Sequence, residues 1–148
     1  MLFRSKFINK FLPGRLKNYY IKRVKKTRRR NPQFTDVSPE QFKYNIYNFA
    51  ERCKALNVKL AIIKILRPTD LFLKKSPFIK LNIDLYNSIY EKASLDFDNI
   101  TIIDPIDIKL DINSLCIDEL HINNQGHKLY FNAVEKYINY HHHHYHYS

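Results

Sequence analysis

Glycine is scarce in this chain: Gly14 and Gly126 are the only two in 148 residues, and tryptophan is absent. So few glycines are unusual for an enzyme, because enzyme loops have to bend around a substrate. No run of 18 apolar residues occurs, which excludes a transmembrane helix. The N-terminus also lacks the apolar stretch and cleavage site of a secretory signal. These absences leave one globular domain of ordinary size as the expected class.

Cysteine is rare as well. Cys53 and Cys116 lie far apart in the sequence, and their spacing fits neither a metal site nor a redox motif. We therefore expect two reduced thiols in a cytoplasmic protein. The sequence predicts no cofactor.

Acidic residues are missing from the first 35 positions, which carry 12 Lys/Arg and a net charge of +12. The remaining positions carry 13 Lys/Arg against 14 Asp/Glu, a net charge of −1, so one segment holds the whole excess of +11. Within it, apolar residues recur at helical spacing on both sides of Pro13-Gly14, which predicts one or two basic helices. The apolar positions are Leu2, Phe3, Phe7, Ile8, Phe11, Leu16, Tyr19, Tyr20 and Val24.

A basic amphipathic segment of this kind, here residues 1–36, has three possible roles. It can lie on an anionic membrane, contact nucleic acid phosphates, or pack on the neutral body with its charges in solvent. All three remain open from the sequence.

The middle of the chain alternates helical and strand patterns. Ser38-Pro39-Glu40-Gln41 is a helix start with a capping box, and apolar residues follow at steps of three and four to about Leu56. Asn57 is expected to close that helix. Residues 58–65 are short, apolar and β-branched, as in a buried strand of a parallel sheet. A helix over 78–93 and a strand over 99–104 follow, so the expected fold class is α/β.

The last third begins with a loop over residues 106–117 and ends in an amphipathic helix that starts after His121, with Asn123 or Asn124 as its cap. Its apolar stripe runs through residues 129–138. Residues 141–148 are rich in His and Tyr and are expected to be a disordered tail. The predicted organisation is therefore a basic segment (1–36), an α/β region (37–140) and a tail (141–148).

Asp118 and His121 are the candidate catalytic residues. An aspartate three residues before a histidine, at the end of a loop, supplies a general base and the group that orients it. The block continues as Asn123-Asn-Gln-Gly126-His127 and runs into the last helix.

This block resembles the last conserved block of the SGNH (GDSL) hydrolases, in which Asp-x-x-His leads into an Asn-x-x-Gly-His helix start. The resemblance extends over about residues 37–140: a Pro-Glu-x-Phe helix start, a buried strand, a segment similar to the family's Asn-x-x-Tyr-Asn but one residue longer (Asn-x-x-x-Tyr-Asn, residues 82–87), and a strand ending in Asp104. It implies the C-terminal part of a flavodoxin-like, three-layer fold with a parallel sheet.

The resemblance also implies roles for single residues. His121 would take the proton from a serine hydroxyl, and Asp118 would hold its imidazole in the right tautomer. Gly126 would allow tight packing at the start of the final helix, and His127 would be structural. The implied substrate is an acyl or acetyl ester, with a carbohydrate ester as one option.

Two blocks of that family are absent. The chain contains no Gly-Asp-Ser, which supplies the nucleophile, and no Gly-x-Asn-Asp, which supplies oxyanion-hole donors. We therefore expect a truncated hydrolase that is inactive alone and needs its missing N-terminal half. Two parallel strands are too few for a stable sheet, so we also expect an exposed edge and self-association.

Two further hypotheses compete with the ester hydrolase. One is a non-enzymatic module that binds nucleic acid or an anionic membrane through residues 1–30. The other is a zinc site built from Asp118, His121 and His127, with or without the histidines of the tail.

Overall fold

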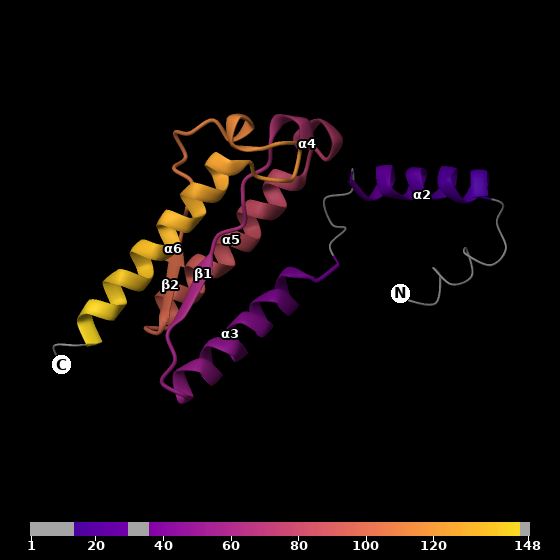
Figure 1. Ribbon diagram of the computed structural model, residues 1–148. Helices are drawn as coiled ribbons and strands as arrows, with labels where there is room; N and C mark the ends of the chain where they lie inside the picture. Colours follow the sequence, from indigo (N-terminus) through magenta and orange to yellow (C-terminus); the bar gives the residue numbers. More distant parts are fainter. Residues whose placement is uncertain (1–13, 30–35, 146–148) are drawn as a thin grey trace.

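The computed structural model describes residues 14–29 and 36–145. Its elements are helix α2 (Gly14–Arg29), helix α3 (Pro39–Ala55), strand β1 (Leu60–Ile63), helix α4 (Asp70–Lys75), helix α5 (Ile79–Asp96), strand β2 (Ile100–Ile103), the 3₁₀ turn η1 (Ile112–Leu115) and helix α6 (Asn124–Tyr145). Figure 1 shows them in chain order, with α2 set apart from the other elements.

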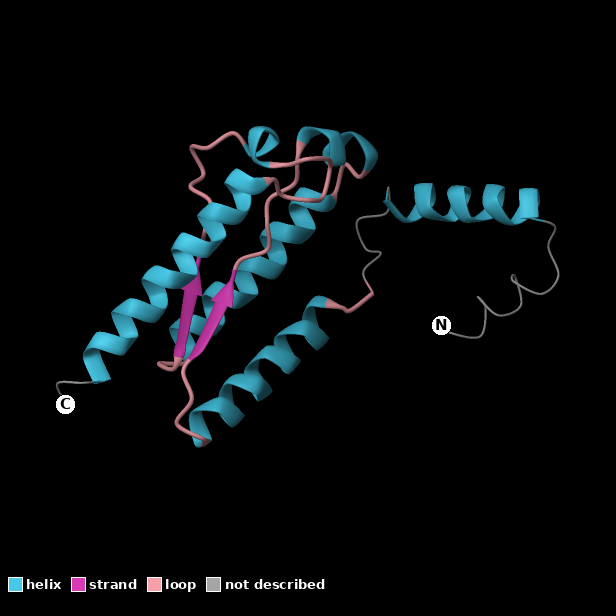
Figure 2. Ribbon diagram, viewed as in Figure 1, coloured by secondary structure: helices cyan, strands magenta, loops and turns pink. Residues whose placement is uncertain are grey.

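The α/β prediction is confirmed at the level of fold class. Strands β1 and β2 pair in parallel, with Leu60 opposite Ile100 and Ile63 opposite Ile103. Helix α6 lies on one face of this small sheet, and α5 and α3 lie on the other (Figure 2). The sheet is therefore covered on both faces at β2, as parallel sheets require.

Helix α3 begins as its sequence predicts. The Ser38 hydroxyl accepts a hydrogen bond from the Gln41 amide at 3.2 Å, and Pro39 occupies the first turn. The second half of the capping box is not made, because the Gln41 side chain donates to Asn45 instead. Asn57, with φ of 55°, closes the helix in the left-handed region that asparagine tolerates.

The core lies where the α3 and α5 helices meet the sheet. Ala50 of α3 and Ala93 of α5 are fully buried against Ile62 and Ile100. Because alanine is small, both helices can approach the strands closely at this point. A second cluster, Ile106, Ile112 and Leu115, anchors the loop after β2 to the first turns of α6.

Several predicted boundaries shift in the structure. The two strands are shorter than expected, α5 extends three residues further, and the loop between β1 and α5 contains the unexpected helix α4. Helix α6 continues to Tyr145, into the segment that we expected to be a disordered tail, and residues 146–148 lie outside the described residues. The basic helix predicted after Pro13-Gly14 is observed as α2, and the helical pattern predicted before it lies in residues 1–13, outside the described residues.

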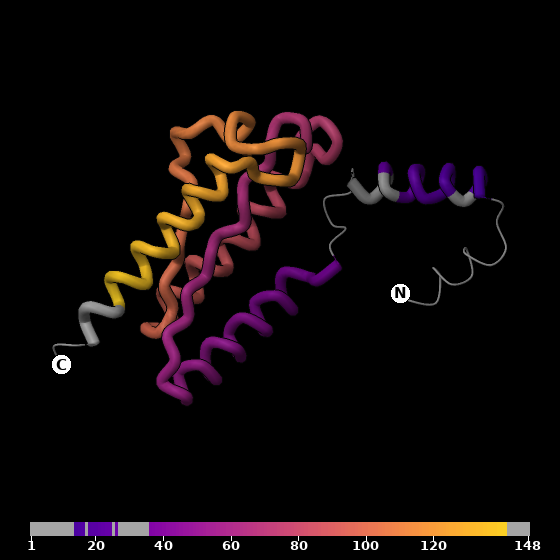
Figure 3. The backbone as a smooth tube through the Cα atoms, in the orientation of Figure 1, coloured from indigo at the N-terminus to yellow at the C-terminus, as the bar shows by residue number. Residues whose placement is uncertain are grey.

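Both strands point the same way (Figure 2), and the chain that follows each of them leads to the same end of the molecule (Figure 3). Helix α4, turn η1 and the start of α6 gather there. Ligand sites in open α/β sheets lie at this end. No helix in the described ranges is long and apolar enough to cross a membrane.

The outer edge of β1 carries no strand in the described part of the chain. Leu60 and Lys64 donate their amides to Asn99 and Ile103, so their backbone groups face β2. Alternate residues of a strand point the opposite way, so Ala61 and Ile63 direct their N–H and C=O groups outward. At Ile65 the outward groups are satisfied, because the Asn87 side-chain amide both donates to and accepts from its backbone, at 2.9 and 2.8 Å. The open edge is therefore short and centred on Ala61–Ile63.

Candidate active site

The segment 116–123, at the carboxyl end of the sheet, forms a tight loop that presents Asp118 and His121. An antiparallel bridge joins Cys116 to Ile122, and the Ile117 amide donates to the His121 carbonyl at 2.8 Å. The two candidate residues are thus fixed by backbone pairing at the base of their own loop.

Asp118 and His121 form a hydrogen-bonded pair. His121 Nδ1 lies 2.8 Å from Asp118 Oδ2 and 3.1 Å from Oδ1. The Oδ1 atom also accepts the amides of Leu120 and His121, each at 2.8 Å. Because the carboxylate can only accept, this contact places the imidazole proton on Nδ1 and leaves Nε2 as the basic nitrogen. The pair therefore has the arrangement of a general base with its orienting group.

The Asp118 carboxylate is strongly stabilised in its charged form. The backbone N–H of Leu120, the His121 side chain and the backbone N–H of His121 together lower the pKa of Asp118 to about 2. It is therefore an anion at any pH at which the imidazole acts as a base. The pair stays open to solvent, with 74% of the His121 side chain and 50% of the Asp118 side chain exposed.

We predict a pH signature for this pair in the stability of the chain. A carboxylate whose pKa falls from its ordinary value near 4 to about 2 on folding stabilises the folded state above about pH 4, and this contribution is lost as the pH falls toward 2. The urea midpoint of Asp118→Asn should therefore lie below that of the wild type at pH 6 and converge with it near pH 2. A difference that does not change with pH would mean that the carboxylate is not specifically stabilised.

Helix α4 supports the loop from the side. The buried Thr69 caps α4 through its hydroxyl, which also donates to the Glu119 carbonyl at 3.1 Å. The Glu119 side chain forms an ion pair with Lys75 at the other end of the same helix. These contacts attach the residue next to Asp118 to a helix from the first half of the fold.

Asn123 is the cap of α6, one of the two candidates from the sequence. Its Oδ1 accepts the amides of Gln125 and Gly126, each at 3.0 Å, and its Nδ2 donates to the Ser114 carbonyl at 2.8 Å. One side chain thus starts the helix and ties it to η1, directly after the Asp118–His121 loop.

Gly126 is tightly packed, as the resemblance implied. A Cβ at this position would lie 2.8 Å from the Leu115 carbonyl oxygen and 2.8 Å from the Ile122 Cβ. Since carbon atoms do not approach that closely, α6 would have to move away from η1 and from the loop.

We therefore predict that Gly126→Ala destabilises the chain by about 1–3 kcal/mol, the usual range for overpacking. Urea unfolding of the two proteins measures this difference. His127→Ala is the matched control, because His127 is exposed on the next position of the same turn. Equal midpoints for Gly126→Ala and the wild type would contradict the packing at this point.

Other polar side chains organise the end of the sheet, in contacts that the sequence did not predict. Lys64 forms ion pairs with Glu91 at 2.7 Å and with Asp104, at the end of β2, at 3.2 Å. Arg67 donates to the carbonyls of Asp107 and Ile108 at 3.0 and 2.8 Å. The sequence places Arg67 and Asp104 at the ends of the two predicted strands, whereas Lys64 lies inside the first of them and gives no separate signal.

The described serines do not supply an evident nucleophile. The Ser38 hydroxyl caps α3, and those of Ser88, Ser94 and Ser114 donate to backbone carbonyls three residues before them. Ser76 is buried after α4, and Ser5 lies outside the described residues. The zinc hypothesis gains no support: among the side chains that the structure describes, no group of three His, Cys, Asp or Glu could hold a metal ion, and those of His142, His143, His144 and His146 are not among them.

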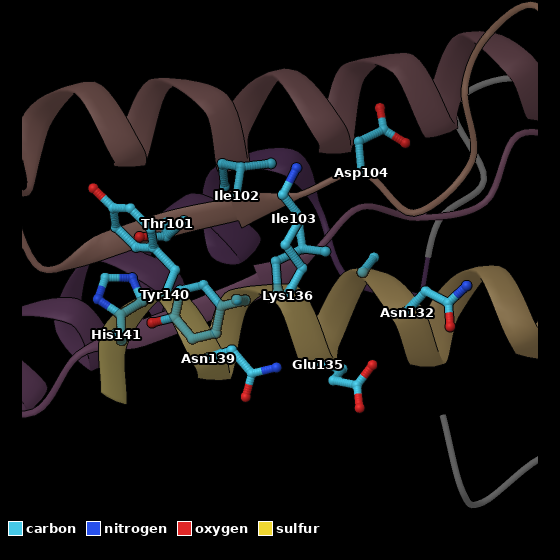
Figure 4. Close-up of a pocket in the computed structure, with 12 residues that line it drawn as sticks. Thr101, Ile102, Ile103, Asp104, Asn132, Glu135, Lys136, Asn139, Tyr140 and His141 are labelled. Atoms are coloured by element: carbon cyan, nitrogen blue, oxygen red, sulfur yellow. The ribbon is translucent and has the colours of Figure 1, made fainter. Parts of the chain in front are cut away.

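Two hollows lie near the sheet, and neither is lined by the candidate pair. The larger, of about 930 Å³, runs between β2 and α6; Figure 4 shows Asp104, Asn132, Lys136 and Tyr140 around it. The smaller, of about 260 Å³, lies beside Arg67 and Asn87 at the strand ends. In the described chain, Asp118 and His121 are therefore presented on an open surface and not inside either hollow.

Comparison with known proteins identifies no family: no family model, no curated protein and no solved structure matches this chain.

Proposed function

We propose that this chain carries the acid–base half of an SGNH-type serine ester hydrolase and acts on an acyl or acetyl ester. The observation that supports it most is the Asp118–His121 pair, with Nδ1 bound to the carboxylate and Nε2 left as the base. Its place at the carboxyl end of a parallel sheet agrees with a catalytic role. A carbohydrate-linked ester is one option within this substrate class.

In this proposal the nucleophilic serine and the oxyanion donors come from polypeptide outside these 148 residues. That polypeptide would extend the sheet beyond β1, where the backbone groups of Ala61 and Ile63 face outward, and would complete a flavodoxin-like sheet. A strand added there would run close to the strand ends at which the Asp118–His121 loop lies.

The chain alone should hydrolyse esters extremely slowly. Loss of the serine from a catalytic triad costs on the order of 10⁶ in turnover, and loss of an oxyanion donor costs roughly a further 10² to 10³. What remains is a histidine–aspartate pair on an exposed surface. We expect it to act on p-nitrophenyl acetate no faster than free imidazole at the same concentration.

The test is reconstitution. The chain is co-expressed with the polypeptide encoded immediately upstream of it, and p-nitrophenyl acetate hydrolysis is compared for the complex and for each part. The proposal requires activity in the complex alone, and labelling of a serine in the added polypeptide by a fluorophosphonate. Equal hydrolysis by the chain with and without that polypeptide would contradict it.

A further inference from the structure

Helix α2 has an apolar side that nothing in the described chain covers. Leu16, Tyr19 and Tyr20 are 54%, 63% and 47% exposed. Their spacing of three and four residues places them on one side of the helix, with Val24 one turn further on. Arg23, seven residues after Leu16 and four after Tyr19, lies on the same side, and a long arginine side chain can carry its charge away from apolar neighbours. Packing on the neutral body, one of the three roles that the sequence left open, is therefore not seen at these residues.

The charge of α2 is of one sign. Its 16 residues include eight Lys/Arg and no acid. Arg15, Lys22 and Lys26 are separated by seven and four residues, so they fall on a common strip beside the apolar side. Residues 36–148, in contrast, carry a net charge of −1. The attraction of the chain to an anionic surface is thus concentrated in and before this helix.

The two sides together distinguish a lipid surface from a nucleic acid. Phosphate contacts with nucleic acid would use the basic strip alone and leave Leu16, Tyr19 and Tyr20 in water. An anionic bilayer can bind both sides of the helix, because the lysines and arginines contact lipid phosphates while leucine and tyrosine enter the headgroup region. Tyrosine suits that boundary, since its ring is apolar and its hydroxyl remains hydrated.

We infer that α2 lies in the plane of an anionic lipid bilayer and holds the body of the chain at that surface. The orientation is fixed by the helix: its apolar side faces the acyl chains, and its basic strip lies at the headgroups. The helix rests on the surface and does not span the bilayer, because it is too short and too charged to do so.

The experiment is vesicle flotation of the full chain with phosphatidylcholine vesicles that contain either no or 30% phosphatidylglycerol. We expect flotation with the anionic vesicles only, and a steep loss as salt rises from about 0.05 to 0.5 M, because screening shortens the reach of the charges. Two double variants test the two sides of the helix separately. Leu16→Ser with Tyr20→Ser changes the apolar side, and Lys22→Gln with Lys26→Gln changes the basic strip. Each pair should weaken binding to anionic vesicles at least tenfold.

The matched control is Lys92→Gln with Lys128→Gln, which removes the same charge from exposed positions of the body and should change binding less than twofold.

Binding to a 20-base-pair DNA duplex, measured by fluorescence anisotropy, tests nucleic acid as the alternative partner. The inference is overturned if vesicles of both compositions fail to float the chain. It is also overturned if duplex binding exceeds vesicle binding and survives the Leu16/Tyr20 change, because the apolar side would then have no part in recognition.

Discussion

His121→Ala is expected to lower the turnover of p-nitrophenyl acetate by the reconstituted enzyme by about 10⁴-fold or more. The imidazole is the only group of the pair that can take the proton of an attacking hydroxyl, and removal of the base from a serine triad leaves little beyond binding and oxyanion stabilisation. The measurement is kcat at saturating substrate, for the wild type and the variant in the same complex.

Asp118→Asn should cost about the same, on the order of 10⁴-fold, although the side chain keeps its size. An asparagine cannot be an anion, and it can donate to Nδ1, which would place the imidazole proton on Nε2 and abolish the base. His127→Ala is the control within the same block, because its side chain is exposed and takes no part in the hydrogen bonds that join Asp118 to His121. Activity that survives His121→Ala, or that is lost equally in His127→Ala, would remove the catalytic assignment.

The second large effect concerns association through the edge of β1. We expect the isolated chain to self-associate, because Ala61 and Ile63 present unpaired backbone groups and Ile63 is 39% exposed beside them. Ala61→Pro removes an outward N–H without removing a bond to β2, since the β1 amides that face β2 belong to alternate residues. Sedimentation velocity should show a shift from oligomer to monomer in the variant.

Leu95→Lys is the control for this effect. It removes a more exposed apolar side chain, on α5, and leaves the strand edge intact, so association should persist. The complementing polypeptide should also disperse the oligomer, because it is proposed to occupy the same edge. A wild-type chain that is monomeric at all concentrations would contradict the edge as an association site.

Local signals in the sequence predicted the order and type of most elements. The Ser38 cap, the left-handed Asn57 and the β-branched runs of the two strands act through contacts within a few residues, so they can be recognised without the fold. The Asp118–His121 pair could be found for the same reason, because its two members lie in one loop.

The remaining features depend on contacts between distant residues. Asn87 hydrogen bonds the backbone of Ile65, and Thr69 hydrogen bonds Glu119, across separations of 22 and 50 residues, which no local pattern encodes. Helix α4 was missed because six residues are too few for a periodic signal. The continuation of α6 through the histidines follows from propagation of an existing helix, which costs less than starting one.

The measurement that tests the central claim most directly is the tautomer of His121 in the chain itself. Two-bond ¹H–¹⁵N correlation spectra distinguish a ring protonated at Nδ1 from one protonated at Nε2. We predict that the neutral ring of His121 carries its proton on Nδ1, toward Asp118, and that Asp118→Asn moves the proton to Nε2. A His121 ring that is protonated at Nε2 in both proteins would show that Asp118 does not orient a general base.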